Sequence, residues 1–449
     1  MFDVVVVGGG FRGLLSAYLA KKNNLRVAII ERGESLGGVL NSFAWNGYLI
    51  DRGVQLFDSV PAELQQIIVE DIEVDIEPIT FKYASVYDGE VTQGFALPNY
   101  SSISKGDKEK ILFEMVERID NENDSSQNFE QFLINRYGPT ATKLISGSFE
   151  NIYRIGLAET DVSALSQTAF HRLYFVDDEM AINLKGHPKL DQKLAARRMA
   201  MGKVDDFVSF YPKSRAMKGI AEAFEKKLEE MGCMVYTSQE IESIDHAAKT
   251  SKSGVKISTD KEDLFAKKVI WCSPLSQLEH SLHGTSNIAE LEHSTPMITV
   301  AFETEAKNIN DYTYFHQFSH DSLVFRSSAM GVYSSQISSE GKTFVTAECP
   351  TDLGSRFWND PESYLNVIWS ELVGMGLVKG GVSLPKTYNY AKLRKTHVMP
   401  KVGHTEALKK MIEISSSEYP DIITHGHQAF LRRDIFINAK KNIGEFVKT

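Results

Sequence analysis

Residues 4–13 read Val-Val-Val-Val-Gly-Gly-Gly-Phe-Arg-Gly, and this stretch decides the fold. Four consecutive valines predict a buried strand, and the glycines after them predict a sharp turn into a helix. Gly8 supplies backbone freedom for the turn, Gly10 lets a phosphate approach the main chain, and Gly13 lets the helix lie tightly against the strand. A Gly-x-Gly-x-x-Gly sequence in this setting indicates a dinucleotide-binding turn.

The residues after the turn complete the same pattern. The first helical turn includes Phe11 and Arg12, and its amide groups would point at the phosphate charge. Residues 26–30 form a second short apolar run, which predicts a buried strand. Glu31 stands at the carboxyl end of that run, where a carboxylate can accept hydrogen bonds from both ribose hydroxyls of an adenosine. A negative group there disfavours the 2′-phosphate of NADP.

Residues 31–42 and 47–57 resemble the FAD-binding start of the amine oxidase superfamily, which includes protoporphyrinogen oxidases, phytoene desaturases and UDP-galactopyranose mutases. In that superfamily a glycine doublet, here Gly37-Gly38, brings main-chain amides to the flavin side of the pyrophosphate. The chain departs from the pattern at Val39, where the family often has an arginine, and at Gln55, where the mutases have a histidine. The resemblance implies FAD as the cofactor. The implied FAD contacts are Gly8, Gly10, Phe11, Arg12, Gly13, Glu31, Arg32, Gly37, Gly38, Val39, Gln55, Leu56 and Ile241.

Fainter similarities to the same superfamily continue along the chain. The similar segments are 129–138, 211–220, 239–244, 269–274 and 422–434. In the last of them Gly426-His427 stands where the family usually has Gly-Asp or Gly-Arg. His427 and Arg433 are candidates for a role near the flavin because this tail motif lies there in relatives. No catalytic residue is assigned.

Length and composition agree with a two-domain flavoprotein, since 449 residues of which 42% are hydrophobic can bury large cores. The expected fold class is α/β, with a Rossmann-type FAD-binding domain interleaved with a mixed α+β substrate domain. The FAD-binding domain is expected at 1–70, 205–285 and 391–449, and the substrate domain at 71–204 and 286–390.

Charge and hydropathy exclude several kinds of partner. The net charge of −10 argues against a nucleic-acid partner, because a phosphate backbone demands a basic face. No apolar run approaches the roughly 20 residues of a membrane span, and the first strand leaves no room for a signal peptide. The pairs His316/His320 and His425/His427 lack a convincing third ligand, so no metal site is predicted. We expect a cytoplasmic protein with a small-molecule substrate, and assign no oligomeric state.

Three functions remain open at this stage. The first is an FAD-dependent oxidoreductase that transfers a hydride from a small polar substrate, such as an amine, alcohol or sugar derivative, to flavin N5. The second is a flavoenzyme that resembles UDP-galactopyranose mutase and isomerises a nucleotide sugar without net redox change. The third is a non-catalytic flavin-binding protein.

Overall fold

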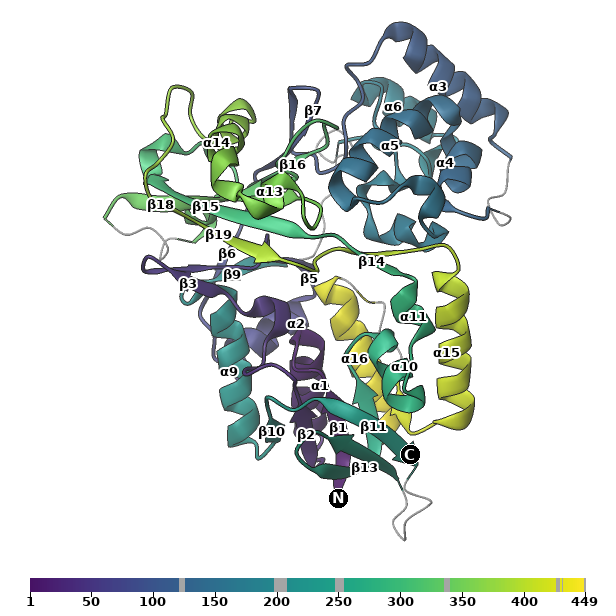
Figure 1. Ribbon diagram of the computed structural model, residues 1–449, viewed down its shortest axis with the longest axis vertical. Helices are drawn as coiled ribbons and strands as arrows, with labels where there is room; N and C mark the ends of the chain where they lie inside the picture. Colours follow the sequence, from purple (N-terminus) through teal and green to yellow (C-terminus); the bar gives the residue numbers. More distant parts are fainter. Residues whose placement is uncertain are drawn as a thin grey trace. The chain divides into compact units, whose positions relative to one another are not determined.

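The chain folds into two compact units. The computed structural model describes residues 1–120, 126–197, 208–246, 254–334, 340–424, 429 and 431–447. Unit 1 comprises residues 1–79, 206–290 and 406–449, and unit 2 comprises residues 80–205 and 291–405 (Figure 1).

The first unit is built on a seven-stranded sheet. The strand order is β10 (Met234–Tyr236), β2 (Val27–Ile30), β1 (Phe2–Val7), β13 (Asp263–Trp271), β12 (Val255–Thr259) and β11 (Ile241–His246), and β21 (Ile422–Ile423) also pairs with β13. The pairs among β10, β2, β1, β13 and β21 are parallel, whereas β11 and β12 are antiparallel. Val4, Val5 and Val6 are fully buried, as a strand covered on both faces requires. The predicted Rossmann-type strands at residues 4–7 and 26–30 are thus confirmed.

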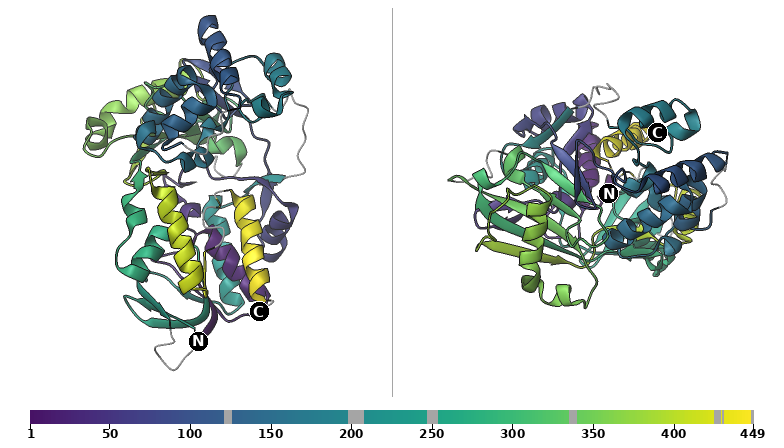
Figure 2. Two further views of the ribbon diagram at one scale, coloured as in Figure 1. Left: turned by 90° about the vertical axis from the view of Figure 1, so that its right-hand side faces the viewer. Right: turned by 90° about the horizontal axis from the view of Figure 1, so that it is seen from above.

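Helices cover this sheet. They are α1 (Phe11–Lys22), α9 (Ala216–Glu230), α10 (Leu275–His283), α11 (Asn287–Glu290), α15 (His404–Glu418) and α16 (Arg432–Val447). α1 follows β1 directly and packs against both α9 and α16, and the three helices run side by side in Figures 1 and 2. Tyr18, Leu14 and Leu15 of α1 are buried because this helix is enclosed by the sheet and its two neighbours.

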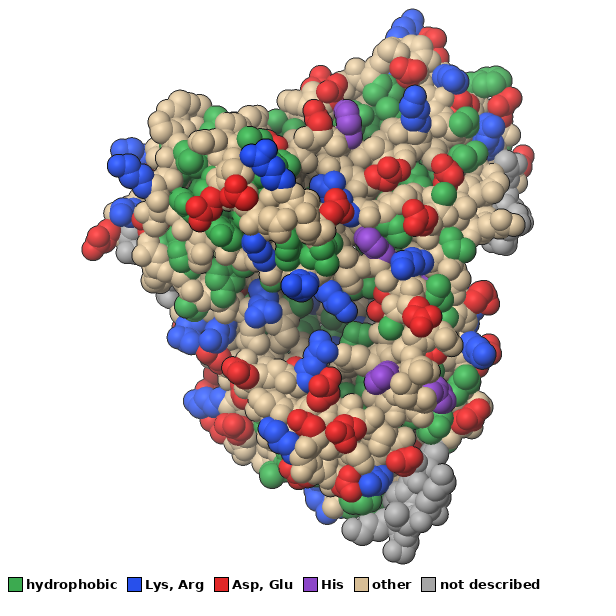
Figure 3. Space-filling model, viewed as in Figure 1, with side chains coloured by type: hydrophobic (Ala, Val, Ile, Leu, Met, Phe, Trp, Pro, Cys, Tyr) green, Lys and Arg blue, Asp and Glu red, His purple; other side chains and the backbone are tan. Residues whose placement is uncertain are grey.

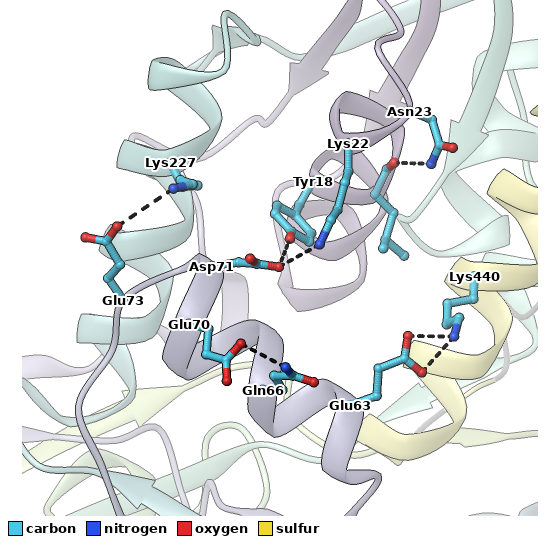
Figure 4. A network of polar contacts seen from close by, with 11 residues as sticks. Tyr18, Lys22, Asn23, Glu63, Gln66, Glu70, Asp71, Glu73, Lys227 and Lys440 are labelled. Carbon is cyan, nitrogen blue, oxygen red and sulfur yellow. Dashed lines mark hydrogen bonds and ion pairs between the residues drawn. The ribbon is translucent and has the colours of Figure 1, made fainter.

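Short elements join the sheet of the first unit to its helices. They are the 3-10 turn η1 (Gly38–Leu40), the hairpin β3 (Phe43–Trp45) and β4 (Tyr48–Ile50), the small sheet of β5 (Phe57–Val60), β9 (Val208–Pro212) and β6 (Ile76–Pro78), the helix α2 (Ala62–Gln66) and the π-helical turn η2 (Ile67–Asp71). A surface network of polar contacts holds η2 in place (Figure 4). Asp71 accepts hydrogen bonds from Tyr18 and Lys22 of α1, and Lys440 of α16 contacts Glu63 of α2 at 2.7 Å.

The second unit combines a mixed sheet with helices. The sheet order is β19 (Tyr388–Leu393), β15 (Met297–Glu305), β18 (Lys342–Pro350), β17 (Arg326–Ser328), β16 (Tyr314–Gln317), β7 (Tyr83–Tyr87) and β8 (Glu90–Gln93). One face packs on α12 (Met330–Tyr333), α13 (Arg356–Asn359) and α14 (Leu365–Gly374) through a buried apolar cluster that includes Phe302, Phe315 and Trp369. A second apolar cluster belongs to α3 (Lys105–Glu117), α4 (Phe129–Tyr137), α5 (Pro139–Tyr153), α6 (Asp178–Lys185) and α7 (Pro188–Asp191).

Residues 391–405 differ in placement from the expected domain segments, since they lie in unit 2 rather than with the FAD-binding domain. The reason is strand pairing. β19 pairs with β15, and β20 (Val398–Pro400) pairs with β14 (Glu292–Ser294), so this stretch contacts the mixed sheet before the chain returns at α15.

In the part of the chain that the structure describes, no helix is both long enough and apolar enough to cross a bilayer. Acidic and basic side chains are both spread over the face drawn in Figure 3.

Candidate dinucleotide-binding site

The turn between β1 and α1 depends on two glycines for its own packing. Gly8 has φ +98°, and a Cβ atom there would lie 2.7 Å from the Ser273 hydroxyl oxygen. A Cβ atom at Gly13 would lie only 1.8 Å from the Gly8 carbonyl oxygen. Protein contacts alone therefore explain these two glycines, since any side chain would force the turn and the helix apart.

Gly10 is different, because nothing in the described protein crowds it. Its φ of −69° is open to any residue, and a Cβ atom there would meet no atom within 4 Å. Gly10 is also the N-cap of α1, where no side chain accepts a hydrogen bond and no acidic residue lies in the first turn. The amides of this turn thus have no side-chain cap, and such a helix end can bind a ligand phosphate.

Glu31 lies beside the turn with its carboxylate fixed by two main-chain amides. Oε2 accepts a hydrogen bond from the Gly9 amide and Oε1 accepts one from the Gly33 amide, each at 2.7 Å. Each carboxylate oxygen has a further lone pair, so ribose hydroxyls can still be bound. Arg32, the neighbour of Glu31, is exposed.

The glycine doublet packs on the phosphate turn itself. The Gly37 amide donates to the Gly9 carbonyl oxygen at 2.7 Å, and Gly37 has φ +118°. A Cβ atom at Gly38 would lie 3.1 Å from the Gly10 Cα atom. Two main chains therefore meet here with no side chain between them. Val39, directly after the doublet, is 59% exposed.

Phe11 and Arg12 make protein contacts with their side chains. Phe11 is buried and contacts the rings of Phe57 and Phe224 edge to face, with centroids 5.3 and 6.2 Å away. Arg12 donates a hydrogen bond from Nη2 to the Ala429 carbonyl oxygen at 2.7 Å, and burial lowers its pKa. The side chains of both residues thus contact other parts of the protein. Their main-chain amides lie in the first turn of α1, where a phosphate would bind.

Arg432, the first residue of α16, holds Gln55 and Leu56, two of the expected flavin contacts. Its guanidinium carbon lies 4.5 Å from the ring centroid of Phe57. Nη2 donates to the Gln55 side-chain oxygen at 3.0 Å, and Nη1 donates to the Leu56 carbonyl oxygen. The Gln55 amide nitrogen in turn donates to the Arg52 carbonyl oxygen at 3.2 Å, so the orientation of this side chain is fixed at both ends. Burial lowers the pKa of Arg432 to about 10, although the Asp51 carboxylate opposes this shift.

Asp51 is a buried carboxyl group that joins distant parts of the first unit. Oδ1 accepts from the Ser42 hydroxyl at 2.6 Å and from the Met217 amide at 3.2 Å, and Oδ2 accepts from the Tyr211 hydroxyl at 2.7 Å. Burial raises the pKa of Asp51 to about 6, against the opposing effect of these hydrogen bonds and of Arg432.

The structure brings most of the expected site residues together. One candidate, His427, is not among the residues that it describes. Ile241 begins β11, and the main chain just before it reaches the Glu31 carbonyl oxygen through the Gln239 amide at 3.1 Å. Arg433 contacts its neighbour Asp434 at 3.2 Å, and Arg432 donates to Gln55 and Leu56, two of the predicted flavin contacts. Within the described ranges, no group of three histidine, cysteine or acidic side chains could hold a metal ion.

These features fit an adenine dinucleotide whose pyrophosphate is held by amides. The open position at Gly10 and the uncapped helix provide an anion site, while Glu31 provides an acceptor pair at the carboxyl end of β2. Arg432 and Asp51 were not predicted as part of this arrangement. The sequence signal for both was their place inside the segments that resemble the amine oxidase superfamily.

Comparisons with known proteins agree with this geometry. The family described as NAD(P)-binding Rossmann-like domain matches residues 6–70. The chain is 42% identical over 64 residues to the "FAD-binding monooxygenase lolF1" of Epichloe uncinata, which is 14% of this chain and 12% of that protein. It is 28% identical over 120 residues to the "Probable flavin-containing monoamine oxidase A" of Dictyostelium discoideum, which is 27% of this chain and 26% of that protein. The match thus spans a minor part of either relative.

Solved structures extend the likeness to the whole chain at the level of fold. A reduced UDP-galactopyranose mutase has a TM-score of 0.74 at 15% identity, with 100% of this chain and 94% of the other covered. A putative protoporphyrinogen oxidase from Exiguobacterium sp. 255-15 has a TM-score of 0.67 at 17% identity, with 99% and 98% covered. A putrescine oxidase bound to putrescine has a TM-score of 0.64 at 13% identity, with 100% and 99% covered. The resemblance seen in the sequence is therefore confirmed at the level of fold, since the chain has the fold that the mutase, the protoporphyrinogen oxidase and the putrescine oxidase share.

Proposed function

We propose that the protein is an FAD-dependent oxidoreductase that transfers a hydride from a small polar substrate to flavin N5. The observation that carries this proposal is Gly10, where the protein leaves open space at an uncapped helix end. Flavin-dependent names among the relatives aligned over 64 and 120 residues support FAD as the dinucleotide. Bound FAD would supply a two-electron acceptor for a hydride from a substrate C–H bond, with a proton lost from the heteroatom on that carbon.

The chain's own residues would bind and orient the cofactor. The first-turn amides of α1 would hold the pyrophosphate, and Glu31 would accept hydrogen bonds from the ribose. The Gly38 amide would be offered to the same diphosphate, since the Gly37 amide is bonded to the Gly9 carbonyl oxygen. Gln55, fixed by Arg432, would lie close to the flavin. The further proposed contacts are Gly8, Phe11, Arg12, Gly13, Arg32, Val39, Leu56 and Ile241.

The test is a spectrum followed by anaerobic turnover. The purified protein should be yellow, or become yellow when FAD is added, and a substrate from a panel of amines, alcohols and sugars should bleach the flavin without oxygen. Protein that stays colourless after incubation with FAD would refute the cofactor assignment. Isomerisation of a nucleotide sugar that needs dithionite but consumes none would favour a mutase, and a coloured protein that no substrate reduces would favour a binding role.

A further inference from the structure

One row of the mixed sheet of unit 2 is polar from β15 to the edge strand β8. Residues paired directly across neighbouring strands project to the same face. Strand register therefore puts these side chains on one face, in order: Ala391, Thr299, Glu348, Arg326, His316, Ser85 and Thr92. The adjoining row on the opposite face is mostly apolar, and its Val300, Ala347 and Phe315 are fully buried against the helices. The polar row is thus the other face of the sheet.

The centre of this row is an ion pair with unused hydrogen-bonding capacity. Arg326 donates from Nε and Nη2 to the two carboxylate oxygens of Glu348, both at 2.7 Å. The Arg326 side chain keeps 20% of its surface exposed, and its Nη1 atom makes no hydrogen bond to any described residue. Removing such a pair in favour of apolar residues often costs a fold nothing, so stability alone does not account for it.

Two histidines lie beside the pair. His316 stacks on Phe325, with ring centroids 5.7 Å apart, and its Nδ1 lies 3.4 Å from the Ala96 carbonyl oxygen. His397 meets Phe325 edge to face at 5.6 Å, and neither of its ring nitrogens bonds to any described residue. Burial and the Arg326 charge lower the pKa of each histidine to about 4, so both are neutral at pH 7.

The charges in this cluster cancel while its donors and acceptors remain. Arg326 and Glu348 neutralise each other, so a substrate cation would meet a carboxylate already compensated, and a substrate anion would meet a cation already compensated. A hydroxyl group is both donor and acceptor, and it matches the free Arg326 edge together with the neutral imidazoles. Flat walls are present as well, since Tyr83 and Tyr314 stack with centroids 5.5 Å apart at 8°.

We propose that Arg326, Glu348, His316 and His397 form a binding site in unit 2 for an uncharged, hydroxyl-rich substrate, such as a sugar or polyol. This inference rests on the proposed function, because it names the substrate whose carbinol C–H bond would be oxidised. The site would bind hydroxyl compounds more tightly than amines or carboxylic acids.

Matched probes that differ in charge test the inference. D-glucose and D-sorbitol represent the uncharged class, D-glucosamine the cationic class and D-glucuronate the anionic class, with binding to the flavin-loaded protein measured by calorimetry. We expect an uncharged probe to bind at least tenfold more tightly than either charged probe. Equal or tighter binding of a charged probe, or no binding by any of the four, would overturn the proposal.

Variants locate the binding. The double variant Arg326→Met/Glu348→Leu removes both charges together and avoids a lone buried charge, while His397→Phe keeps a ring of similar shape. Both should weaken binding of the uncharged probe at least tenfold. The matched control is Lys342→Met/Glu303→Leu, an ion pair of 3.4 Å between β18 and β15 of the same sheet, which should leave binding unchanged. Wild-type affinity in both test variants would refute the site.

The flavin spectrum separates this inference from the proposed function. A protein that takes up no FAD fails the proposed function, yet calorimetry with the same probes still decides whether unit 2 binds hydroxyl compounds. A flavoprotein that is bleached by an amine at equal rates in the wild type and the Arg326→Met/Glu348→Leu variant keeps the proposed function and overturns this inference.

Discussion

The carbonyl oxygen of Gly8 lies 1.8 Å from the position that a Cβ atom would take at Gly13. This contact is between main-chain segments at the end of β1 and the start of α1, so neither side can move away as a flexible side chain would. We therefore expect Gly13→Ala to destabilise unit 1 by about 1–3 kcal/mol, the usual cost of overpacking a tight site, and to reduce its FAD content. Denaturation midpoints and the ratio of FAD to protein measure both effects.

Gly444→Ala is the control for this substitution. Gly444 lies in α16 of the same unit, and a Cβ atom there would meet nothing within 4 Å. Alanine at an open helical position should be neutral or stabilising by up to about 1 kcal/mol. If Gly13→Ala were as well tolerated as Gly444→Ala, the result would contradict the close contact between α1 and the end of β1 at Gly8.

Glu31→Gln should weaken FAD binding about 10- to 150-fold, which corresponds to the 1.5–3 kcal/mol of a hydrogen bond to a charged group. Glutamine has one acceptor oxygen, so it cannot serve both the Gly9 and Gly33 amides as the carboxylate does. The measurement is titration of deflavinated protein with FAD. Glu34→Gln, an exposed acid in the same loop, should bind FAD like the wild type. Equal affinity in the Glu31 variant would exclude the ribose assignment.

The sequence predicted local contacts well and distant contacts poorly. Gly8, Gly13 and Glu31 lie within one strand–helix–strand segment, where spacing alone sets which residues meet. Asp51 and Tyr211 are 160 residues apart, and their hydrogen bond joins the residue after β4 to β9, a contact that no local pattern indicates. Prediction was also limited at the start of α16, where Arg432 and Arg433 are adjacent. The orientation of the helix decides that Arg432 contacts Gln55, and the sequence does not indicate that orientation.

Asp51 should make the stability of unit 1 fall as pH rises. Its pKa of about 6 in the folded protein exceeds that of an unfolded aspartate, so the folded state holds the proton more tightly. The resulting stabilisation is complete below pH 4 and is lost as pH rises through 6, and it amounts to about 3 kcal/mol. Asp51→Asn should remove this slope, because its side chain stays neutral. Denaturation midpoints at pH 4.5, 6 and 7.5 measure the difference between variant and wild type.

The exposed Asp75 provides the control for this pH dependence. Asp75→Asn should leave the slope of the wild type unchanged. A constant difference between Asp51→Asn and the wild type at all three pH values would show that Asp51 does not titrate in this range.

Arg432→Lys should lower the stability of unit 1 and speed the loss of FAD. Arginine here stacks on Phe57 while it donates to Gln55 and Leu56, and lysine has neither the planar fork nor the second nitrogen that this geometry needs. The loss of a charged hydrogen bond suggests a cost of about 1.5–3 kcal/mol. Thermal unfolding and the rate of flavin release on dilution measure the effect. Arg26→Lys gives a matched control in the same unit, because the Arg26 side chain is exposed, and it should change stability by less than about 0.5 kcal/mol. If Arg26→Lys were as damaging as Arg432→Lys, the loss would not come from the contacts with Gln55 and Leu56, and the assignment of Arg432 to the flavin side of the site would fail.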